Sequence, residues 1–204
     1  MKIVLASNNA GKLAELQTLF APLGMTLVRQ SELNIPEAAE PFKTFVENAL
    51  AKARHAAQLS GLPALADDAG LCVDAFGGQP GVDTAYYATR FGYPKGDDTN
   101  VTALLEQMQS LDNRRAAMVS TLVAVRSADD PEPLIAVGRV VVQITPERRG
   151  SNGFGFDPVM YLPEFGKTFA ELPPEVKNAH SHRGRAAQAM LALMRERWLD
   201  GAAA

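Results

Sequence analysis

The hydrophobic pattern of this 204-residue chain predicts strands that alternate with helices. Residues 3–6 form a short apolar run, and leucines then recur three or four positions apart, as in a strand followed by a helix. Residues 45–60 show helical spacing again, and Thr44 with Glu47 matches a capping box at the start of that helix. This alternation favours an α/β fold, with residues 1–204 in a single domain.

Longer apolar runs in the second half of the chain predict the spine of a sheet. Residues 116–125 and 134–144 are rich in residues that favour strands, and the polar segment between them predicts a turn. The two runs are therefore expected to form an antiparallel hairpin. Apolar positions between residues 187 and 198 recur at helical spacing and predict a closing amphipathic helix.

Composition limits the classes of protein to which the chain can belong. With 47% apolar residues and a formal net charge of -3, it can bury an ample core but lacks the basic excess of a duplex nucleic-acid binder. A bound anion must therefore be met by positive groups gathered locally. No apolar run approaches the roughly 18 to 20 residues that span a bilayer, and the start lacks an apolar signal segment, so a cytoplasmic location is expected. The single cysteine, Cys72, is expected in the core.

Two adjacent carboxylates, Asp67 and Asp68, stand between the apolar, strand-like runs 62–66 and 71–73. Paired charge in such a position suggests a bound cation, and carboxylate oxygens suit Mg²⁺. Adjacent residues of a strand point to opposite faces, so both carboxylates can reach one ion only if the chain leaves strand geometry, which Gly70 would allow. The alternative is a polar turn between two strands.

The loop between the first predicted strand and helix is a candidate anion site. Backbone N–H groups at a helix N-terminus attract phosphates, Gly11 allows close approach, and Lys12 adds charge. The loop is not a Walker loop, because Ala6 stands in place of its first glycine and Leu13 in place of its serine or threonine. An ordinary capped turn is the alternative. The loop residues are Ser7, Asn8, Asn9, Ala10, Gly11 and Lys12.

A second glycine-rich loop, residues 150–158, contains two phenylalanines that are expected to be exposed. Phe154 and Phe156 flank a glycine with neither helical nor strand spacing, and aromatic side chains placed in this way suit a flat ligand. The loop lacks the dinucleotide-binding fingerprint, because Pro158 takes the place of the third glycine. The alternative is a bulged turn in the core.

Several further polar residues are ambiguous when each is taken singly. Glu40 lies in an acidic loop and Lys52 in a predicted helix, where a solvated surface charge is the ordinary interpretation. Ser181, His182 and Arg183 begin the last predicted helix, where a serine cap is common.

Taken together and in this order, these segments resemble the inosine/xanthosine triphosphate pyrophosphatases, which hydrolyse non-standard purine nucleoside triphosphates to monophosphate and pyrophosphate. The resemblance covers essentially the whole chain. The residues that carry it are 7–12, Thr44-Phe45, Glu47-Asn48-Ala49, Ala66-Asp67-Asp68, Pro80-Gly81, 153–158 and Ser181-His182-Arg183.

The resemblance implies a long mixed sheet with flanking helices that form two lobes around a substrate cleft. It implies Mg²⁺ bound by Glu40 and Asp68, to which the neighbouring carboxylate of Asp67 is added here. Asp68 would also be the base that takes a proton from the attacking water. The first loop would hold the phosphates, while Lys12 and Lys52 would stabilise the charge that develops on them.

The resemblance also implies which residues bind the purine. Phe154 is expected to stack on the base, while His182 and Arg183 present donors to its 6-position, where hypoxanthine and xanthine carry an oxygen and adenine an amino group. Two positions depart from the usual pattern, since Ala69 replaces a serine and Phe156 replaces a tyrosine or tryptophan, which leaves selectivity against GTP open. The expected substrate-binding residues beyond the first loop are Ala69, Phe154, Gly155, Phe156, Asp157, Lys177, His182 and Arg183.

Two alternative functions are set against this one. A related family of nucleotide pyrophosphatases carries Ser-Pro-Arg-Arg in its first loop, where this chain has Asn-Ala-Gly-Lys. A catalytically silent nucleotide-binding protein on the same scaffold would lose its metal carboxylates, whereas all three are present. The resemblance further implies a homodimer, for which Tyr86, Tyr87 and Phe91 offer aromatic contact surface.

Overall fold

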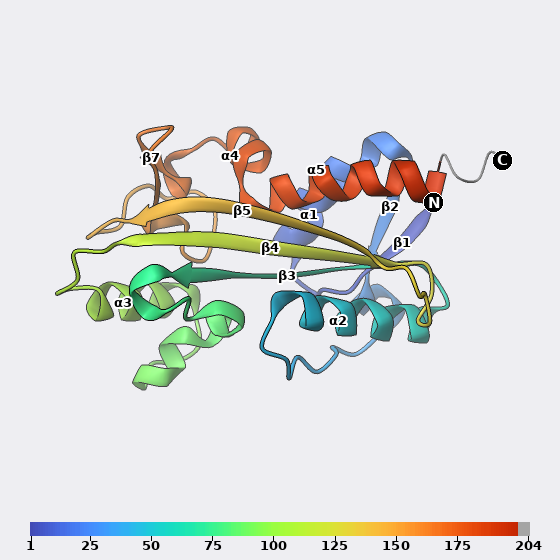
Figure 1. Cartoon of the computed structure of the whole chain (residues 1–204), viewed down its shortest axis with the longest axis horizontal. Coiled ribbons are helices and arrows are strands. Elements are labelled where there is room, and N and C mark those ends of the chain that lie inside the picture. The colour runs from blue at the N-terminus through green and yellow to red at the C-terminus, as the bar shows by residue number, and fades with distance from the viewer. Residues whose placement is uncertain (200–204) are drawn as a thin grey trace. The chain divides into compact units, whose positions relative to one another are not determined.

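The computed structural model describes residues 1–199 and contains a mixed sheet. Its strands are β1 (Lys2–Leu5), β2 (Thr26–Arg29), β3 (Ala64–Val73), β4 (Arg115–Val125), β5 (Leu134–Ile144), β6 (Met160–Leu162) and β7 (Lys167–Thr168). In the described residues their order is β2-β1-β3-β4-β5-β6-β7. β1 pairs in parallel with β2 and β3, whereas β6 is antiparallel to β5 and β7. The predicted α/β class with a long mixed sheet is confirmed (Figure 1).

The α-helices begin and end at the kinds of residue that favour helix boundaries. They are α1 (Ala10–Phe20), α2 (Phe45–Ser60), α3 (Asp97–Gln107), α4 (Pro174–His180) and α5 (His182–Met194). As predicted, Thr44 caps α2, its hydroxyl oxygen accepting from the N–H of Glu47 at 3.4 Å. The same helix ends at Gly61, whose φ of 66° lies in the left-handed region. None of the helices within residues 1–199 is long and apolar enough to span a membrane.

The chain divides into two compact units, in agreement with the two lobes implied by the resemblance. The first unit comprises residues 1–68, 120–138 and those from 182 onward, and the second comprises residues 69–119 and 139–181. The three longest strands, β3, β4 and β5, each contribute residues to both units.

In the first unit, the alternation of side chains along each strand builds a core on each face of the sheet. Ile3 and Leu5 of β1 pack with α1 and α5, whereas Val4 between them packs with α2. In β3, Leu65 packs in the core on the side of α1 and α5, and Ala66 packs in the core on the side of α2. Figure 1 shows α1 and α5 on one side of the sheet and α2 on the other.

β3 is continuous from Ala64 to Val73, so the alternative of a polar turn between two strands is wrong, and the chain does not leave strand geometry at the two aspartates. β3 lies between β1 and β4 in the sheet. β1 ends at Leu5, opposite Leu65 and so before the two aspartates, whereas β4 is a longer strand of 11 residues. Because β3 stays extended beside β4, Asp67 and Asp68 point to opposite faces of the sheet. Asp67 therefore lies on the side of α1 and α5, and Asp68 lies on the side of α2.

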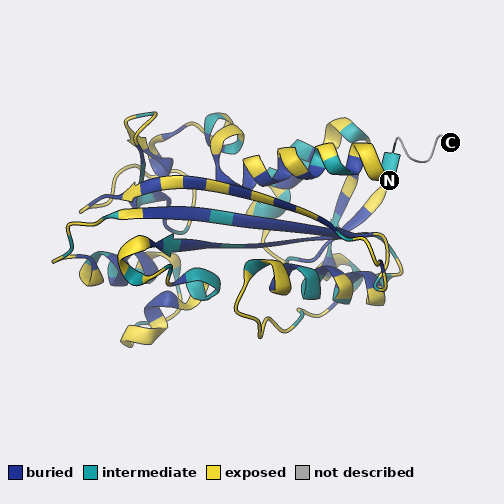
Figure 2. Cartoon of the chain, viewed as in Figure 1, coloured by how far each residue is buried: buried dark blue, intermediate teal, exposed yellow. Residues whose placement is uncertain are grey.

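β4 and β5 form the predicted hairpin, and they differ in burial. Figure 1 shows the two strands running in opposite directions, and a short turn joins them. β4 is buried at almost every position, whereas buried and exposed residues alternate along the whole of β5 (Figure 2). One face of β5 therefore belongs to the core, and the other face meets solvent.

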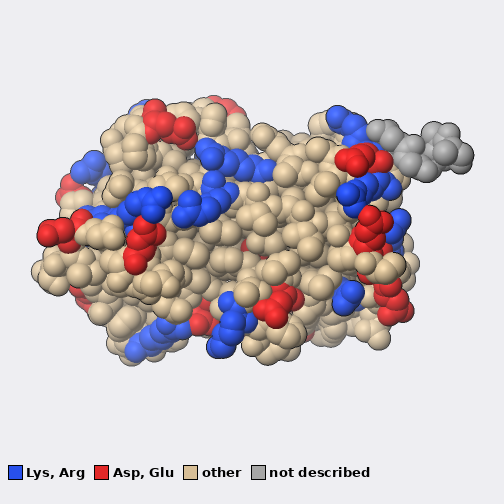
Figure 3. Space-filling model, viewed as in Figure 1, with Lys and Arg blue, Asp and Glu red and all other residues tan. Residues whose placement is uncertain are grey.

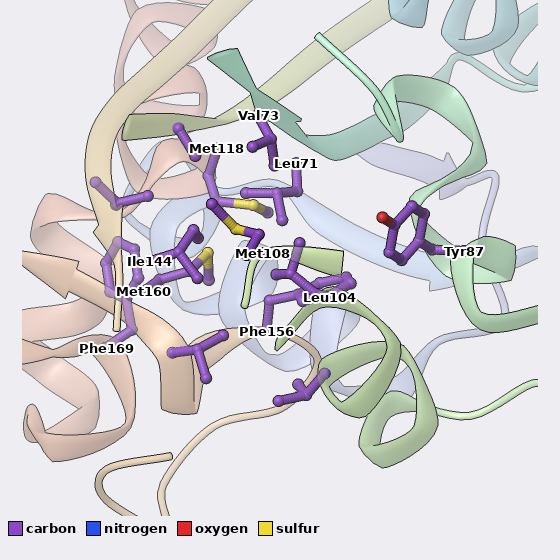
Figure 4. Close-up of a cluster of buried hydrophobic side chains, with 14 of the residues drawn as sticks. Leu71, Val73, Tyr87, Leu104, Met108, Met118, Ile144, Phe156, Met160 and Phe169 are labelled. Atoms are coloured by element: carbon purple, nitrogen blue, oxygen red, sulfur yellow. The ribbon is translucent and has the colours of Figure 1, made fainter. Parts of the chain in front are cut away.

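The second unit has its own core, in which methionine, leucine and isoleucine side chains converge (Figure 4). Phe156 belongs to this core and is only 4% exposed, whereas Phe154 is 38% exposed. The expectation that both phenylalanines of the second glycine-rich loop are exposed is therefore wrong for Phe156. The two rings are separated by the left-handed turn at Gly155, where φ is 62°, and burial of an apolar ring stabilises the core.

We predict that Gly138→Ala destabilises the first unit. A Cβ at this position of β5 would lie 1.9 Å from the carbonyl oxygen of His182 and 2.4 Å from the backbone nitrogen of Ala186. Because both are backbone atoms of α5, the helix would have to shift, and overpacking of this kind typically costs about 1 to 3 kcal/mol. The free energy of unfolding, measured in urea, should fall by this amount.

The matched control is Val137→Thr at the neighbouring exposed position of β5. It keeps a β-branched side chain and should change the free energy of unfolding by less than about 0.5 kcal/mol. Equal stability of Gly138→Ala and the parent would show that α5 does not pack this closely against β5.

Candidate active site

A pocket in the first unit opens where β1 ends. It brings together the first loop, both predicted phosphate lysines and two of the three predicted metal carboxylates. The residues that line it are Ala6, Ser7, Asn8, Asn9, Lys12, Gln30, Glu37, Ala38, Glu40, Lys52 and Asp67. The lining contains two lysines and three carboxylates, so groups of both signs meet in the pocket. Basic and acidic side chains are also both spread over the face of the molecule shown in Figure 3.

The first loop leads directly into α1, as the sequence predicts. Asn9 caps the helix, its side-chain oxygen accepting from the N–H of Lys12 at 3.0 Å. Asn8 donates from its side chain to Glu37 Oε1 at 3.0 Å, which ties the loop to the acidic segment before α2. Ala10 and Gly11 form the first turn of α1. The N-terminus of an 11-residue helix thus lies beside the pocket and favours an anion there.

Asp67 is buried among cationic and hydroxyl groups on the α1 and α5 side of the sheet. Its Oδ2 lies 2.9 Å from Lys12 Nζ and 3.2 Å from Arg183 Nε, and its Oδ1 accepts from Ser120 Oγ at 2.7 Å. Arg183 also contacts Glu15 Oε2 through Nη1 at 2.6 Å. Burial acts to raise the pKa of Asp67, but the charges of Lys12 and Arg183 outweigh it and hold that pKa well below its ordinary range.

Asp68 has a different environment on the α2 side. Lys52 Nζ lies 3.2 Å from Asp68 Oδ1 and 2.7 Å from Glu40 Oε2, so one ammonium group serves two carboxylates. Among the described residues, no group forms a hydrogen bond with the buried Oδ2 of Asp68. Burial raises the pKa of Asp68, and Glu40 adds to the rise that Lys52 opposes. Burial acts to lower the pKa of Lys52, but Asp68 and Glu40 outweigh it and raise that pKa, so the ammonium stays charged.

The donor set around Asp68 fits a Mg²⁺ ion. Asp68 and Glu40 supply hard oxygen atoms, one of them buried without a hydrogen bond, and together they exceed the charge of Lys52 by one. Within residues 1–199, no group of three or more His, Cys, Asp or Glu side chains converges on one point. Two carboxylates nevertheless suffice for Mg²⁺, which commonly takes its remaining ligands from substrate phosphates and water.

In the second unit, Lys177 and Asp157 fix the loop that carries Phe154. Asp157 Oδ2 accepts from Lys177 Nζ at 2.6 Å and from the N–H of Phe154 at 2.9 Å. The Lys177 ammonium also lies 4.5 Å from the centre of the Phe154 ring, a cation–π distance. A Cβ on Gly153 would lie 1.9 Å from Asp157 Oδ2, so only glycine fits there. Asp97, at the start of α3, accepts from the N–H of Gly155 at 2.9 Å.

The chain matches the model of the Ham1 family over residues 3–193. It belongs to the Ham1 family. The resemblance inferred from the sequence motifs is therefore confirmed.

Relatives of this Ham1 chain are similar to it over nearly its whole length. It is 79% identical to the dITP/XTP pyrophosphatase of Paracidovorax citrulli, a match that covers 97% of this chain and 100% of that protein. The dITP/XTP pyrophosphatase of Leptothrix cholodnii is 55% identical, with coverages of 97% and 99%. The solved structure of a HAM1 protein from Coxiella burnetii aligns with a TM-score of 0.89 at 42% identity, covering 96% of this chain and 99% of that one.

The Ham1 chain distributes its predicted site residues between the two units. The first unit contains those of the first loop, Glu40, Lys52, Asp67, Asp68, His182 and Arg183, and the second contains Ala69, Phe154, Gly155, Phe156, Asp157 and Lys177. His182 and Arg183 lie in the first turn of α5, and both are buried.

Three residues that contact this machinery were not identified from the sequence of the Ham1 chain. Ser120 is a polar residue inside an apolar strand, and strand alternation from Leu122 would have placed it on the face of Asp67. Glu15 lies three positions after Lys12 and so shares its side of α1. Asp97 carried no sequence signal beyond its place at the start of a helix.

Proposed function

We propose that this Ham1 protein hydrolyses dITP, ITP and XTP to the nucleoside monophosphate and pyrophosphate, with Mg²⁺ as its cofactor. The relatives that it matches at 55% and 79% identity are named for the dITP and XTP reaction. The observation that carries the proposal is the pocket where β1 ends. There a helix N-terminus and two lysines line one pocket, and Lys52 also contacts the Asp68 carboxylate, whose buried Oδ2 forms no hydrogen bond with any described residue.

The first loop and the two lysines are proposed to bind the triphosphate. Ser7, Asn8 and Asn9 line the pocket next to the positive end of the α1 dipole. Lys12 comes from α1 and Lys52 from α2, so the two ammonium groups reach the pocket from opposite faces of the sheet. Their charges offset the negative charge that develops on the phosphate oxygens during bond cleavage.

Asp68 is proposed to act as the general base. Lys52 holds Oδ1, and Oδ2 then accepts the proton of the attacking water. Burial raises the pKa of Asp68, which strengthens it as a base. As the water oxygen bonds to phosphorus, the bond from that phosphorus to the α–β bridging oxygen breaks. Mg²⁺ held by Asp68 and Glu40 would supply neutralising charge to the phosphates and lower the pKa of a coordinated water.

The purine is proposed to contact the second glycine-rich loop through Phe154. The exposed ring of Phe154 offers a stacking surface, and Lys177 and Asp157 hold its loop in place. His182 and Arg183 are the donors proposed for the 6-oxygen. Arg183 already uses two guanidinium nitrogens on Asp67 and Glu15, and its contact with the base stays a prediction.

This function predicts that the enzyme prefers 6-oxo purines. Pyrophosphate release should be measured with ITP, dITP, XTP, ATP and dTTP, in Mg²⁺ and again after addition of EDTA. An unpaired buried polar group costs about 1 to 3 kcal/mol, so kcat/KM for ITP and XTP should exceed that for ATP by about tenfold to hundredfold. EDTA should abolish the reaction. A silent nucleotide-binding protein would release no pyrophosphate from any of these substrates.

Asp68→Asn is predicted to remove activity without unfolding the protein. The amide keeps the size of the side chain but cannot accept a proton as a base, which should lower kcat by about 10² to 10⁴. Asp129→Asn, at an exposed carboxylate in the turn after β4, is the control and should keep parental turnover. Near-parental turnover of Asp68→Asn in Mg²⁺ would refute the assignment of the base.

Phe154→Ala is predicted to weaken base binding alone. Loss of stacking is worth about 1 to 3 kcal/mol, so KM for ITP and XTP should rise by about fivefold to 150-fold. Inorganic tripolyphosphate, which has no base, is the matched ligand control, and its affinity measured by calorimetry should not change. A parallel loss of tripolyphosphate affinity would contradict the stacking role.

A homodimer is also proposed, on the ground of the resemblance and of exposed aromatic side chains. Tyr86 is 54% exposed and Phe91 is 40% exposed, so both are available for a subunit contact. Tyr87 is 3% exposed and packs in the core of the second unit, so the expectation that it adds to this surface is wrong. Sedimentation at micromolar concentration should show a dimer of the 21.9 kDa chain, and a purely monomeric species would refute it.

A further inference from the structure

Asp67 was grouped with the metal carboxylates because it adjoins Asp68 in sequence, but the fold separates the two side chains. β3 is extended from Ala64 to Val73, so neighbouring side chains point to opposite faces. Asp68 pairs with Lys52 of α2, which also binds Glu40 of the acidic loop, whereas the partners of Asp67 come from α1, β4 and α5. A single ion cannot replace both sets of partners.

Both carboxylate oxygens of Asp67 already accept from other groups. Ser120 Oγ lies 2.7 Å from Oδ1, while Lys12 Nζ and Arg183 Nε lie 2.9 Å and 3.2 Å from Oδ2. Asp67 is 1% exposed and Ser120 is fully buried. A divalent cation at Oδ2 would have to displace one of two positive charges that already hold it, since like charges at that distance repel.

Lys12 is the partner of Asp67 that lines the pocket. Its side chain is 20% exposed, whereas that of Asp67 is completely buried. A lysine side chain is long and flexible, and its ammonium has three N–H donors. When one N–H of Lys12 donates to the buried carboxylate of Asp67, the ammonium is fixed at the pocket wall. The other two N–H groups can then donate to a phosphate.

We propose that Asp67 is a positioning residue, which holds the Lys12 ammonium at the phosphate pocket, and that Ser120 in turn fixes the Asp67 carboxylate. This inference rests on the proposed function, because it requires that Lys12 binds the triphosphate. It assigns the metal to Asp68 and Glu40 without Asp67.

A double-mutant cycle on the full chain tests the proposal. The variants are Asp67→Asn, Lys12→Met and the two combined. Tripolyphosphate affinity is measured by calorimetry with saturating Mg²⁺ and in EDTA, and Mn²⁺ affinity is measured by electron paramagnetic resonance without nucleotide. If Asp67 acts through Lys12, each single variant should weaken tripolyphosphate binding by about tenfold, and the combined variant should be no weaker than Lys12→Met.

The metal readout separates a positioning role from a ligand role. Asp67→Asn should leave Mn²⁺ affinity within about twofold of the parent, whereas Asp68→Asn should weaken it by at least about tenfold. Loss of Mn²⁺ affinity in Asp67→Asn as large as in Asp68→Asn would overturn the proposal. The proposal would also be overturned if the combined variant lost tripolyphosphate affinity by the product of the two single losses, because Asp67 and Lys12 would then act independently.

Ser120→Ala provides a second test in case Asp67→Asn fails to fold. It keeps every charge and removes one hydrogen bond, so tripolyphosphate binding should weaken by about threefold to tenfold in the parent background and not at all beside Lys12→Met. The matched control is Thr121→Val, which removes a buried hydroxyl from the adjacent residue on the opposite face of β4 and should change nothing. Equal weakening by Ser120→Ala with and without Lys12 would overturn the proposal.

The proposed function and this inference can fail separately. If the parent releases no pyrophosphate from ITP but Asp67→Asn and Lys12→Met show the expected coupling in tripolyphosphate binding, the proposed reaction is refuted and the positioning role is supported. If the parent releases pyrophosphate but the two substitutions show no coupling, the proposed reaction is supported and the positioning role is refuted. A parent that binds no tripolyphosphate in either buffer would overturn the positioning role, because Lys12 would then have no phosphate to hold.

Discussion

The candidate site depends on β3 remaining an extended strand through two consecutive aspartates. An extended strand sends adjacent side chains to opposite faces, so each carboxylate must find its own partners. The partners of Asp67 come from α1, β4 and α5, whereas Asp68 pairs with Lys52 of α2, an ammonium that it shares with Glu40 of the loop before that helix. The Asp67-Asp68 dipeptide thereby connects α1, α2 and α5 of the first unit near the end of β1.

The two carboxylates are stabilised to different degrees, and the difference suits different roles. Burial of a charge is costly unless cations and hydrogen bonds compensate for it. Asp67 has two cations and a hydroxyl, and its pKa is held well below the ordinary range. Asp68 shares one ammonium with Glu40, and burial raises its pKa. The less compensated carboxylate is the one able to take a metal ion or a proton, while the fully compensated one is suited to a fixed structural task.

Local signals allowed much of the fold and the first loop to be predicted from the sequence. Thr44 and Glu47 mark the start of α2, and the loop from Ser7 leads into α1, because caps and helical spacing involve residues only a few positions apart. The continuity of β3 was missed, because an acidic pair followed by glycine is also a typical turn sequence. The pairing of β3 with β4, and contacts such as that of Arg183 with Asp67, join residues far apart in the chain. Phe156 and Tyr87 were placed wrongly for the same reason, since their burial depends on distant parts of the second core.

The position of Arg183 illustrates how packing remote from the pocket sets its electrostatics. Arg183 lies in the first turn of α5, and that turn approaches β5 at Gly138 more closely than any side chain would permit. The close approach of the two backbones holds the start of α5 against the sheet and so brings the guanidinium to Asp67. A larger residue at Gly138 would move α5 and with it one of the two cations that keep Asp67 ionised. An uncharged glycine in β5 therefore contributes to the electrostatic environment of Asp67, because the space that its missing side chain leaves is occupied by the backbone of α5.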